Sequence, residues 1–520
     1  MRKLQKNSDI LPAMSYKRRV IVLIVILSFV RLFISSIIDL GNDESYYWLY
    51  SQYLKWNYFD HPPMVSLWIR IFTLNLWLDD HELFLRLGSV TGCAISSWFM
   101  YKCVSTLHSE RAGWFAALLY NASFYSSITA GLLIMPDSPQ MVFWTLSLWM
   151  IARIMADEKN WFNWLLLGIA SGLCIMSKMH GVFIWSGILL YAVSVKRSWL
   201  NQRLFASLSL TMIIASPIVI WNVENNFVTY HFHIQRITPQ VLSLSHFNLL
   251  RELIGQILIN NIFNVAIIII ALSASLNKKN PVQRSLAAYN FIALPLIFSL
   301  LVISFYKHTF PHWSGPGYIT LIPIAAIYLA VTNSTIYFPR ILKYSMGLYL
   351  ISLFVCSLVV KYYPGNFGNN ERNDLGKGDI TLDMNGWREA GEQFAKIYNQ
   401  EILDGKALPA SPVVCYNWWG SHIEYYFCRP GKIRMIGLGS LNDLHQYAWL
   451  NTPRIPLVNF NTAYCVVPSD ENYNVQDEYR DFYSYSDMIA IIHVQRNKIP
   501  THDFYVYRLT GWKNKLPLKK

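Results

Sequence analysis

Acidic and aromatic side chains crowd one segment near the start of the chain. In order, it holds Asp43, Glu44, Tyr46, Tyr47, Trp48, Tyr58, Phe59, Asp60, His61, Pro62 and Pro63. Carboxylates that directly follow an apolar run are costly to desolvate, and a shifted pKa suits such a group to act as a general base. Neighbouring side chains on a helix point about 100° apart, so Asp43 and Glu44 can serve different roles.

The same segment also fits a helix that lies on a membrane surface. Its aromatic residues, together with Tyr50, Tyr53 and Trp56, would then occupy the interface, and its charges would face water. The Pro62-Pro63 break and the second acid-base pair, Asp60-His61, favour a functional site over this alternative.

Further groups that could bind a substrate occur in four later segments. They are Asp137 in Met135–Pro139, Lys178 after an apolar run, Arg236 at the end of a polar-aromatic stretch, and the cluster Lys307, His308 and His312. Lysine offers a point charge and imidazole a donor, which together suit phosphate recognition. Each segment also has a structural explanation: a helix N-cap for Asp137, a snorkelling Lys178, an ordinary surface loop around Arg236, and a basic loop near anionic lipid for the cluster.

The composition places most of the chain in a membrane. The 520 residues are 53% hydrophobic and 14% charged, whereas a soluble domain has about 25% charged residues. The mean hydropathy of +0.26 is too low for a chain that is all membrane. We predict eleven apolar spans, N-terminus inside: 20–38, 83–103, 112–132, 138–155, 163–178, 181–195, 204–221, 256–276, 286–305, 316–332 and 342–360.

The basic loops set the expected orientation. Lys and Arg recur in every second loop, beginning at Lys17-Arg18-Arg19, and such loops belong in the cytoplasm. The loops that face outward are then 39–82, 133–137, 178–180, 222–255 and 306–315, which hold all the candidate residues. Most of the +13 net charge lies in residues 1–360, so orientation explains it without nucleic acid. Arg31 is the one charge deep within a predicted span, where we expect a structural role.

The chain after residue 360 predicts a small outward-facing α/β domain. Residues 413–416, 464–467 and 504–507 have strand patterns, and Gly386–Asn399 has the pattern of an amphipathic helix with Asn385 as its N-cap. The seven cysteines include no CxxC pair, which excludes a disulfide-rich scaffold and offers no metal-ligand spacing. Cys415 and Cys428 could pair in an oxidising compartment.

Together these features predict a transferase whose donor is a lipid phosphate. Carboxylates that can act as base and cations that can hold a phosphate face the same side, at headgroup depth. A cytoplasmic nucleotide donor would need phosphate-binding elements on the inward loops, which carry little beyond basic charge.

The first loop resembles the signature of GT-C membrane glycosyltransferases. The resembling run is Asp43-Glu44-x-Tyr46-Tyr47-Trp48 followed by Tyr58-Phe59-Asp60-His61-Pro62-Pro63-Met64. The nearest branch is the bacterial family 39/83 group of lipid A aminoarabinose transferases, core galacturonosyl transferases and relatives of protein O-mannosyltransferases. Pro136–Pro139, the Lys178 break, Trp221–Val228 and Lys307–Tyr318 are similar to that branch as well. His61 and Met179-His180 depart from the aminoarabinose transferases and fit the galacturonosyl-like group better.

The resemblance implies an inverting transfer in the periplasm of a bacterial inner membrane. The donor would be a polyprenyl-phosphate sugar and the acceptor a lipid or glycan, most simply lipid A or lipopolysaccharide core. Asp43 would be the general base, and Glu44 and Asp60 would position substrate or a cation. Lys178, Lys307, His308 and His312 would stabilise the departing phosphate, with Tyr47, His61, Asp137 and Arg236 as further substrate-binding candidates. No metal is required, although Asp60 and His61 could hold a divalent cation.

Three other functions stay open at this stage. A protein O-glycosyltransferase would use the same class of donor. A flippase or transporter of lipid-linked sugars predicts internal repeats and polar residues deep in several spans, where we find only Arg31. A structural or assembly protein would leave the acids of the first loop unexplained.

Overall fold

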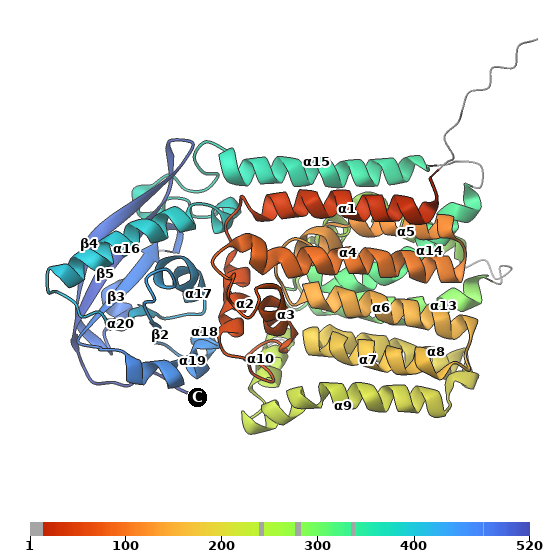
Figure 1. The fold of residues 1–520 in the computed structure, drawn as a ribbon, viewed down its shortest axis with the longest axis horizontal. Coiled ribbons are helices and arrows are strands. Elements are labelled where there is room, and N and C mark those ends of the chain that lie inside the picture. The colour runs from red at the N-terminus through yellow and green to blue at the C-terminus, as the bar shows by residue number, and fades with distance from the viewer. Residues whose placement is uncertain (1–13, 239–243, 276–281, 334–337, 472) are drawn as a thin grey trace, which may run out of the picture.

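The computed structural model describes residues 14–238, 244–275, 282–333, 338–471 and 473–520. A bundle of helices forms one end of the elongated molecule, and the chain after α15, called the sheet domain below, forms the other (Figure 1). The bundle helices are α1 (Tyr16–Ser35), α4 (Glu82–Leu107), α5 (Glu110–Ala122), α6 (Asp137–Ala156), α7 (Trp161–Ser177), α8 (Val182–Ser194), α9 (Gln202–Glu224), α11 (His246–Ile259), α12 (Ile262–Ser275), α13 (Val282–Ser304), α14 (Gly315–Thr332) and α15 (Arg340–Tyr362).

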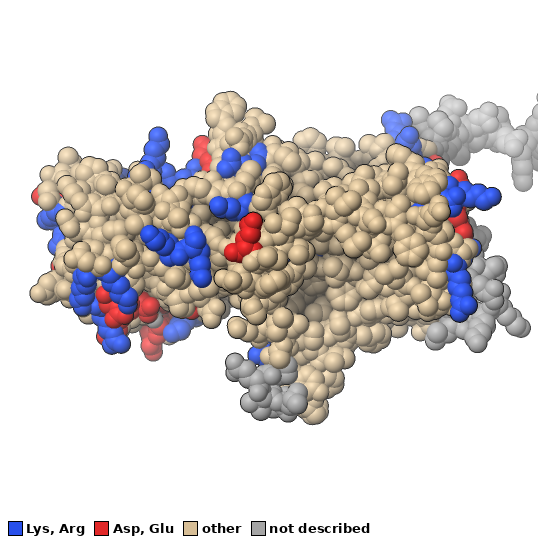
Figure 2. Space-filling view, turned by 90° about the horizontal axis from the view of Figure 1, so that it is seen from below, with Lys and Arg blue, Asp and Glu red and all other residues tan. Residues whose placement is uncertain are grey.

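The helical bundle makes the chain a multi-pass membrane protein. Among the described residues, five helices are long and apolar enough to cross a membrane, or six if a bent pair counts as one span. Figure 2 shows Lys, Arg, Asp and Glu gathered over the sheet domain and at the far end of the bundle, with the helices between them bare of charge on that face. Such an uncharged belt suits contact with lipid chains. The predicted count of eleven spans and their orientation stay predictions.

Two of the expected spans are interrupted. The segment 112–132 ends its helix at Ala122 and continues as a short π-helical turn, Tyr125–Thr129. This break supplies the acceptors for Arg31, whose guanidinium donates to the Ser127 carbonyl and hydroxyl and to Asn121 Oδ1 at 3.0–3.2 Å. Arg31 therefore has the structural role that we expected, and its partners are neutral polar groups and not an acid.

The segment 256–276 is not one helix, contrary to the prediction. Helices α11 and α12 meet there at 98°. The bend centres on Asn261, which adopts a left-handed φ of 69° and donates through Nδ2 to the carbonyls of Ala122 and Ser345 at 2.9 Å. Apolar content alone cannot reveal such a break, because it depends on carbonyl groups from distant helices.

Short helices fill the space between the bundle and the sheet domain. They are α2 (Asn42–Gln52), α3 (Met64–Phe72) and α10 (Val228–Ile237). The alternative in which α2 lies on the membrane surface is excluded, because Tyr46, Tyr47, Trp48 and Tyr50 are all buried. They pack in the same apolar cluster as residues of the sheet domain, which covers them from outside.

The sheet domain is built on five strands in the order β2-β1-β3-β5-β4. These are β1 (Val413–Cys415), β2 (Met435–Gly437), β3 (Thr462–Pro468), β4 (Tyr483–Arg496) and β5 (Ile499–Trp512), with helices α16 (Trp387–Leu403), α17 (Gly420–Ile423), α18 (Leu441–Leu444), α19 (Tyr447–Arg454) and α20 (Val475–Tyr479). β1 runs parallel to β2 and β3, and β5 pairs antiparallel with β3 and β4. The predicted strands 464–467 and 504–507 fall within β3 and β5, and 413–416 covers β1 and one residue beyond it.

Two local predictions for this domain need correction. α16 begins at Trp387, and its N-cap is Gly386 at a φ of 88° rather than Asn385. Cys415 and Cys428 are free thiols in the structure.

Candidate active site

A cavity of about 650 Å³ lies where the bundle, α2, α10 and the sheet domain meet. Its polar wall is formed by Asp43, Tyr46, Tyr47, Asp60, His61, Asp137, Lys178, His180, His233, Arg236 and His312. Its apolar wall comes from α8 and α13, through Val182, Phe183, Leu296, Leu300 and Ile303. A long apolar group and a compact polar group can therefore occupy the same site.

Asp43 projects into this cavity from the first turn of α2. Within the described residues, no hydrogen bond or ion pair binds its carboxylate, and its side chain is open to the cavity space. The surrounding protein and the neighbouring Glu44 raise the pKa of Asp43, while Lys178 and Arg236 oppose that rise. A free carboxylate with a raised proton affinity is suited to act as a general base.

Glu44 points away from the cavity. Its carboxylate accepts two hydrogen bonds from Arg86 of α4, at 2.8 and 2.5 Å, and one each from the backbone N–H groups of Gly41 and Ile134 at 2.9 Å. The Glu44 side chain is only 1% exposed. The two acids do take different directions, but the structure places Glu44 where it fixes α2 to the bundle and does not line the site.

Asp60 closes one side of the polar wall. Its carboxylate accepts a short hydrogen bond from the Tyr50 hydroxyl, and its carbonyl contacts His233 Nε2 at 2.7 Å. Burial raises the pKa of Asp60 to about 6, although the bond from Tyr50 lowers it. Desolvation, with Lys178 and His233 nearby, lowers the pKa of His61 well below its usual range, so His61 is neutral at pH 7. Tyr47 lies against the His61 ring, with ring centroids 5.6 Å apart.

Lys178 and Asp137 form a buried ion pair on the bundle side of the cavity. Lys178 Nζ lies 3.0 and 2.8 Å from the two carboxylate oxygens of Asp137, and the Tyr125 hydroxyl donates to Asp137 at 2.8 Å. Asp137 is thus no helix cap, and Lys178, only 5% exposed, does not snorkel. The pair neutralises most of the Lys178 charge.

Arg236 of α10 is the other cation on the cavity wall. Its guanidinium carbon lies 5.3, 5.6 and 5.3 Å from the ring centroids of Phe232, Phe310 and Trp313. In the part of the chain that the structure describes, no acid or acceptor binds it. Aromatic faces hold the guanidinium plane while its N–H groups remain available, which suits a phosphate.

The basic cluster divides at Phe310. His312 lies in a short 3-10 turn, Pro311–Ser314, and faces the cavity. Lys307 and His308 lie outside the cavity lining, and His308 is exposed. The preceding loop is fixed by Thr309, whose hydroxyl donates to Glu252 at 2.7 Å.

The sequence prediction did not include several cavity residues. Tyr46, His180, His233, Trp418 and His445 line the site as well. His180 and His233 stood in segments already singled out, so their type and place were signals. Trp418 and His445 belong to the sheet domain, and nothing in the local sequence connects them with Asp43.

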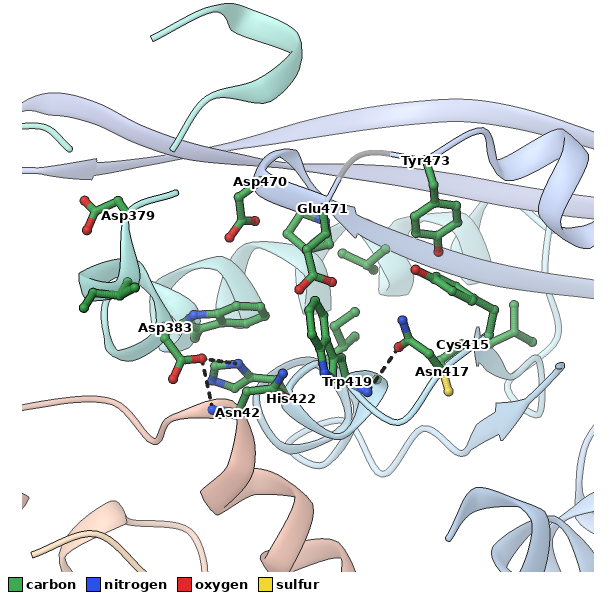
Figure 3. Close-up of a pocket in the computed structure, with 18 of the residues that line it drawn as sticks. Asn42, Asp379, Asp383, Cys415, Asn417, Trp419, His422, Asp470, Glu471 and Tyr473 are labelled. Carbon is green, nitrogen blue, oxygen red and sulfur yellow. Dashed lines mark hydrogen bonds and ion pairs between the residues drawn. The ribbon is translucent and has the colours of Figure 1, made fainter. Parts of the chain in front are cut away.

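A second, smaller cavity of about 230 Å³ lies on the other side of the start of α2. Figure 3 shows Asp383, Asp470, Glu471 and Trp419 around it, with Asn42 at its edge. The Asn42 N–H donates to Asp383 at 3.1 Å. Burial raises the pKa of Asp383 to about 7 and that of Glu471 to about 8. Asn42 and Asp43 follow one another in α2 and therefore line different cavities. Asn42 is bound by Asp383 of the sheet domain.

A divalent cation has no ready ligand set here. Among the described residues, no three His, Cys, Asp or Glu side chains are placed to hold a metal ion together. Asp60 is already bound by Tyr50, and desolvation together with the nearby Lys178 lowers the pKa of His61.

The fold and part of the sequence match known proteins. Residues 60–221 match the family model described as dolichyl-phosphate-mannose-protein mannosyltransferase. A search of the curated proteins found no match. Among solved structures, ArnT from Cupriavidus metallidurans in the apo state is similar with a TM-score of 0.63 and 14% identity, over 95% of this chain and 98% of that one.

The structure of the same ArnT bound to undecaprenyl phosphate also has a TM-score of 0.63 and 14% identity, over 94% of this chain and 97% of ArnT. The agreement extends through both the bundle and the sheet domain, since it covers nearly the whole of both chains. This chain has the fold of the GT-C membrane glycosyltransferases.

Proposed function

We propose that this protein is an inverting glycosyltransferase that moves a sugar from a polyprenyl-phosphate donor to an acceptor in the periplasm, with lipid A or lipopolysaccharide core as the first choice of acceptor. One observation carries the proposal. The carboxylate of Asp43 and the guanidinium of Arg236, both without a hydrogen-bond or ion-pair partner among the described residues, face one cavity that also has an apolar wall.

The two walls suit the two ends of such a donor. The side chains of α8 and α13 offer an apolar surface to a polyprenyl chain, at the level of the bundle. Arg236 and His312 stand beside this surface and can hold the phosphate. The likeness to an ArnT bound to undecaprenyl phosphate supports this placement.

The transfer needs a base on one side of the sugar and a cation on the other. As the acceptor hydroxyl attacks the anomeric carbon, its proton passes to Asp43, and a new C–O bond forms. The bond between the anomeric carbon and the phosphate oxygen breaks, and the polyprenyl phosphate leaves with the electron pair. Arg236 stabilises the charge that develops there, and attack opposite the leaving group inverts the anomeric centre. If the acceptor is itself a phosphate, Asp43 orients it and takes no proton.

The same proposal assigns domains and location. Residues 1–360 would form the transmembrane catalytic domain of a bacterial inner membrane protein, and residues 361–520 the periplasmic domain. The alternation of basic loops supports this orientation. The cavity opens beside the sheet domain, and this arrangement fits a periplasmic acceptor.

A protein O-glycosyltransferase with the same donor class is the second candidate. The match of residues 60–221 to a protein mannosyltransferase model favours it. A transporter is less well supported, because the buried Arg31 has structural acceptors and needs no transported partner.

Mass spectrometry of lipid A and core oligosaccharide from cells lacking the protein tests the choice between a glycolipid acceptor and a protein acceptor. A missing hexose, uronic acid or amino sugar, restored by the wild-type chain, would name the donor sugar and the acceptor. An unchanged glycolipid fraction would remove the first choice, and a loss of sugar from periplasmic proteins would then establish the second.

A further inference from the structure

The sheet domain supplies one wall of the catalytic cavity through Trp418 and His445. Their rings are parallel within 4°, with centroids 5.7 Å apart. The His445 ring also lies parallel within 21° to Phe59 of the first loop, at 4.6 Å, and meets Phe232 of α10 edge-on at 5.1 Å. Aromatic side chains from three separate parts of the chain therefore hold one imidazole in place.

The His445 side chain is 8% exposed, and its Nδ1 makes no hydrogen bond of normal geometry with the described residues, although the backbone of Asn442 lies beside the ring. A buried polar atom without a partner is unfavourable, and a ligand hydroxyl that supplies the partner removes that cost. The aromatic rings beside Nδ1 offer flat apolar surface. Ring faces with a few placed polar groups are the ordinary composition of a small-ligand subsite.

The backbone holds His445 in an unusual position. Its φ of 49° and ψ of −122° lie outside the regions that side chains with a Cβ prefer. The next residue, Gln446, fixes this turn to the first loop: its side chain accepts from the Phe59 N–H at 3.1 Å, and its N–H donates to the Tyr46 hydroxyl at 3.4 Å. Contacts with the catalytic loop thus keep an unfavourable turn that aims His445 at the cavity.

We propose that Trp418 and His445 form the subsite for the acceptor sugar, in which Trp418 stacks on the sugar ring and His445 Nδ1 binds one of its hydroxyl groups. This inference rests on the proposed glycosyl transfer and adds to it the residues that select the acceptor. The donor phosphate and lipid face the bundle wall at Arg236, α8 and α13, whereas this wall belongs to the domain that projects from the bundle. An acceptor that arrives from outside meets the sheet domain first.

Kinetics on the full-length protein in detergent test the subsite. The acceptor is lipopolysaccharide purified from cells lacking the protein, and the donor is the polyprenyl-phosphate sugar fraction of the same cells. His445→Phe keeps the stacked ring and removes both nitrogens, and His445→Asn restores a donor and an acceptor at a residue type that tolerates a positive φ. His231→Phe is the matched control, since His231 is exposed on α10 and lines a different pocket.

We expect His445→Phe to raise the KM for lipopolysaccharide about tenfold, the effect of one lost hydrogen bond. The KM for the donor and the inhibition constant of undecaprenyl phosphate should change less than about twofold, and His445→Asn should recover most of the loss. Equal increases in both KM values, or a loss explained by a lower thermal midpoint, would overturn the subsite. A wild type that transfers nothing to this lipopolysaccharide would remove lipopolysaccharide as the proposed acceptor and the subsite with it, whereas an active His445→Phe with unchanged KM would refute the subsite alone.

Discussion

Glu44 and Asp43 are neighbours in sequence, yet in the structure Glu44 stabilises the fold and Asp43 faces the cavity. The variant Glu44→Gln tests this difference in role. The Glu44 carboxylate accepts four hydrogen bonds, two of them from the Arg86 guanidinium. The amide in Glu44→Gln loses the charge and can accept at only one atom. Arg86, which is fully buried, then lacks its counterion.

Removing one partner of a buried ion pair costs roughly 3–5 kcal/mol of unfolding free energy. The backbone carbonyls of Ile38 and Asp39 also accept from Arg86, at 2.9 and 2.7 Å, so we expect the lower end of that range. For a chain of 520 residues the thermal midpoint should fall by about 3 °C. Transfer per folded molecule at low temperature should stay within about tenfold of the wild type.

Thermal unfolding of the detergent-solubilised protein, followed by light scattering, measures the midpoint. Glu392→Gln is the matched control, because Glu392 is exposed on α16 and should leave the midpoint unchanged. A Glu44→Gln protein with a wild-type midpoint and no transfer would refute the reasoning, and it would return Glu44 to the catalytic role suggested by sequence alone.

Three more perturbations probe the cavity. Arg236→Lys should weaken inhibition by undecaprenyl phosphate about tenfold, since ammonium lacks the planar fork that the aromatic rings hold, and equal inhibition would contradict that role. Asp60 binds a proton more tightly in the folded protein than in the unfolded protein. Its contribution to stability is therefore full below about pH 4 and is lost as pH rises through 6. The unfolding free energy of Asp60→Asn minus that of the wild type should therefore be about 2–3 kcal/mol larger at pH 7.5 than at pH 4. Parallel curves of stability against pH for the two proteins would contradict this. Lys178→Met should lower the unfolding free energy by about 3–5 kcal/mol. The double variant Lys178→Met/Asp137→Asn should lose less than the sum of the losses in the two single variants, and losses that simply add would argue against the buried pair.

The sequence was informative wherever function depended on a local pattern. Apolar stretches with basic flanks located most bundle helices, and the first loop pointed to Asp43, which the structure leaves free in the cavity. Lys178 also lines the cavity, because a cation that directly follows an apolar helix needs a polar environment and few are within its reach.

The rest depended on long-range contacts. The direction of Glu44 was set by Arg86, forty-odd residues away in sequence, and the bend at Asn261 by carbonyls of α5 and α15. The strand β4 was missed because its alternating exposed and buried residues include Ser, Asp and His. His445 offered no local signal, since only the docking of the sheet domain onto the first loop brings it to Asp43.

Asp43→Asn tests the central claim most directly. The variant keeps the size of the side chain and removes the base, and no described hydrogen bond depends on this carboxylate. With purified protein, undiminished folding and unchanged inhibition by undecaprenyl phosphate, we expect sugar transfer to a hydroxyl acceptor to fall by about 10²–10⁴-fold. Transfer at the wild-type rate by purified Asp43→Asn protein would contradict the account.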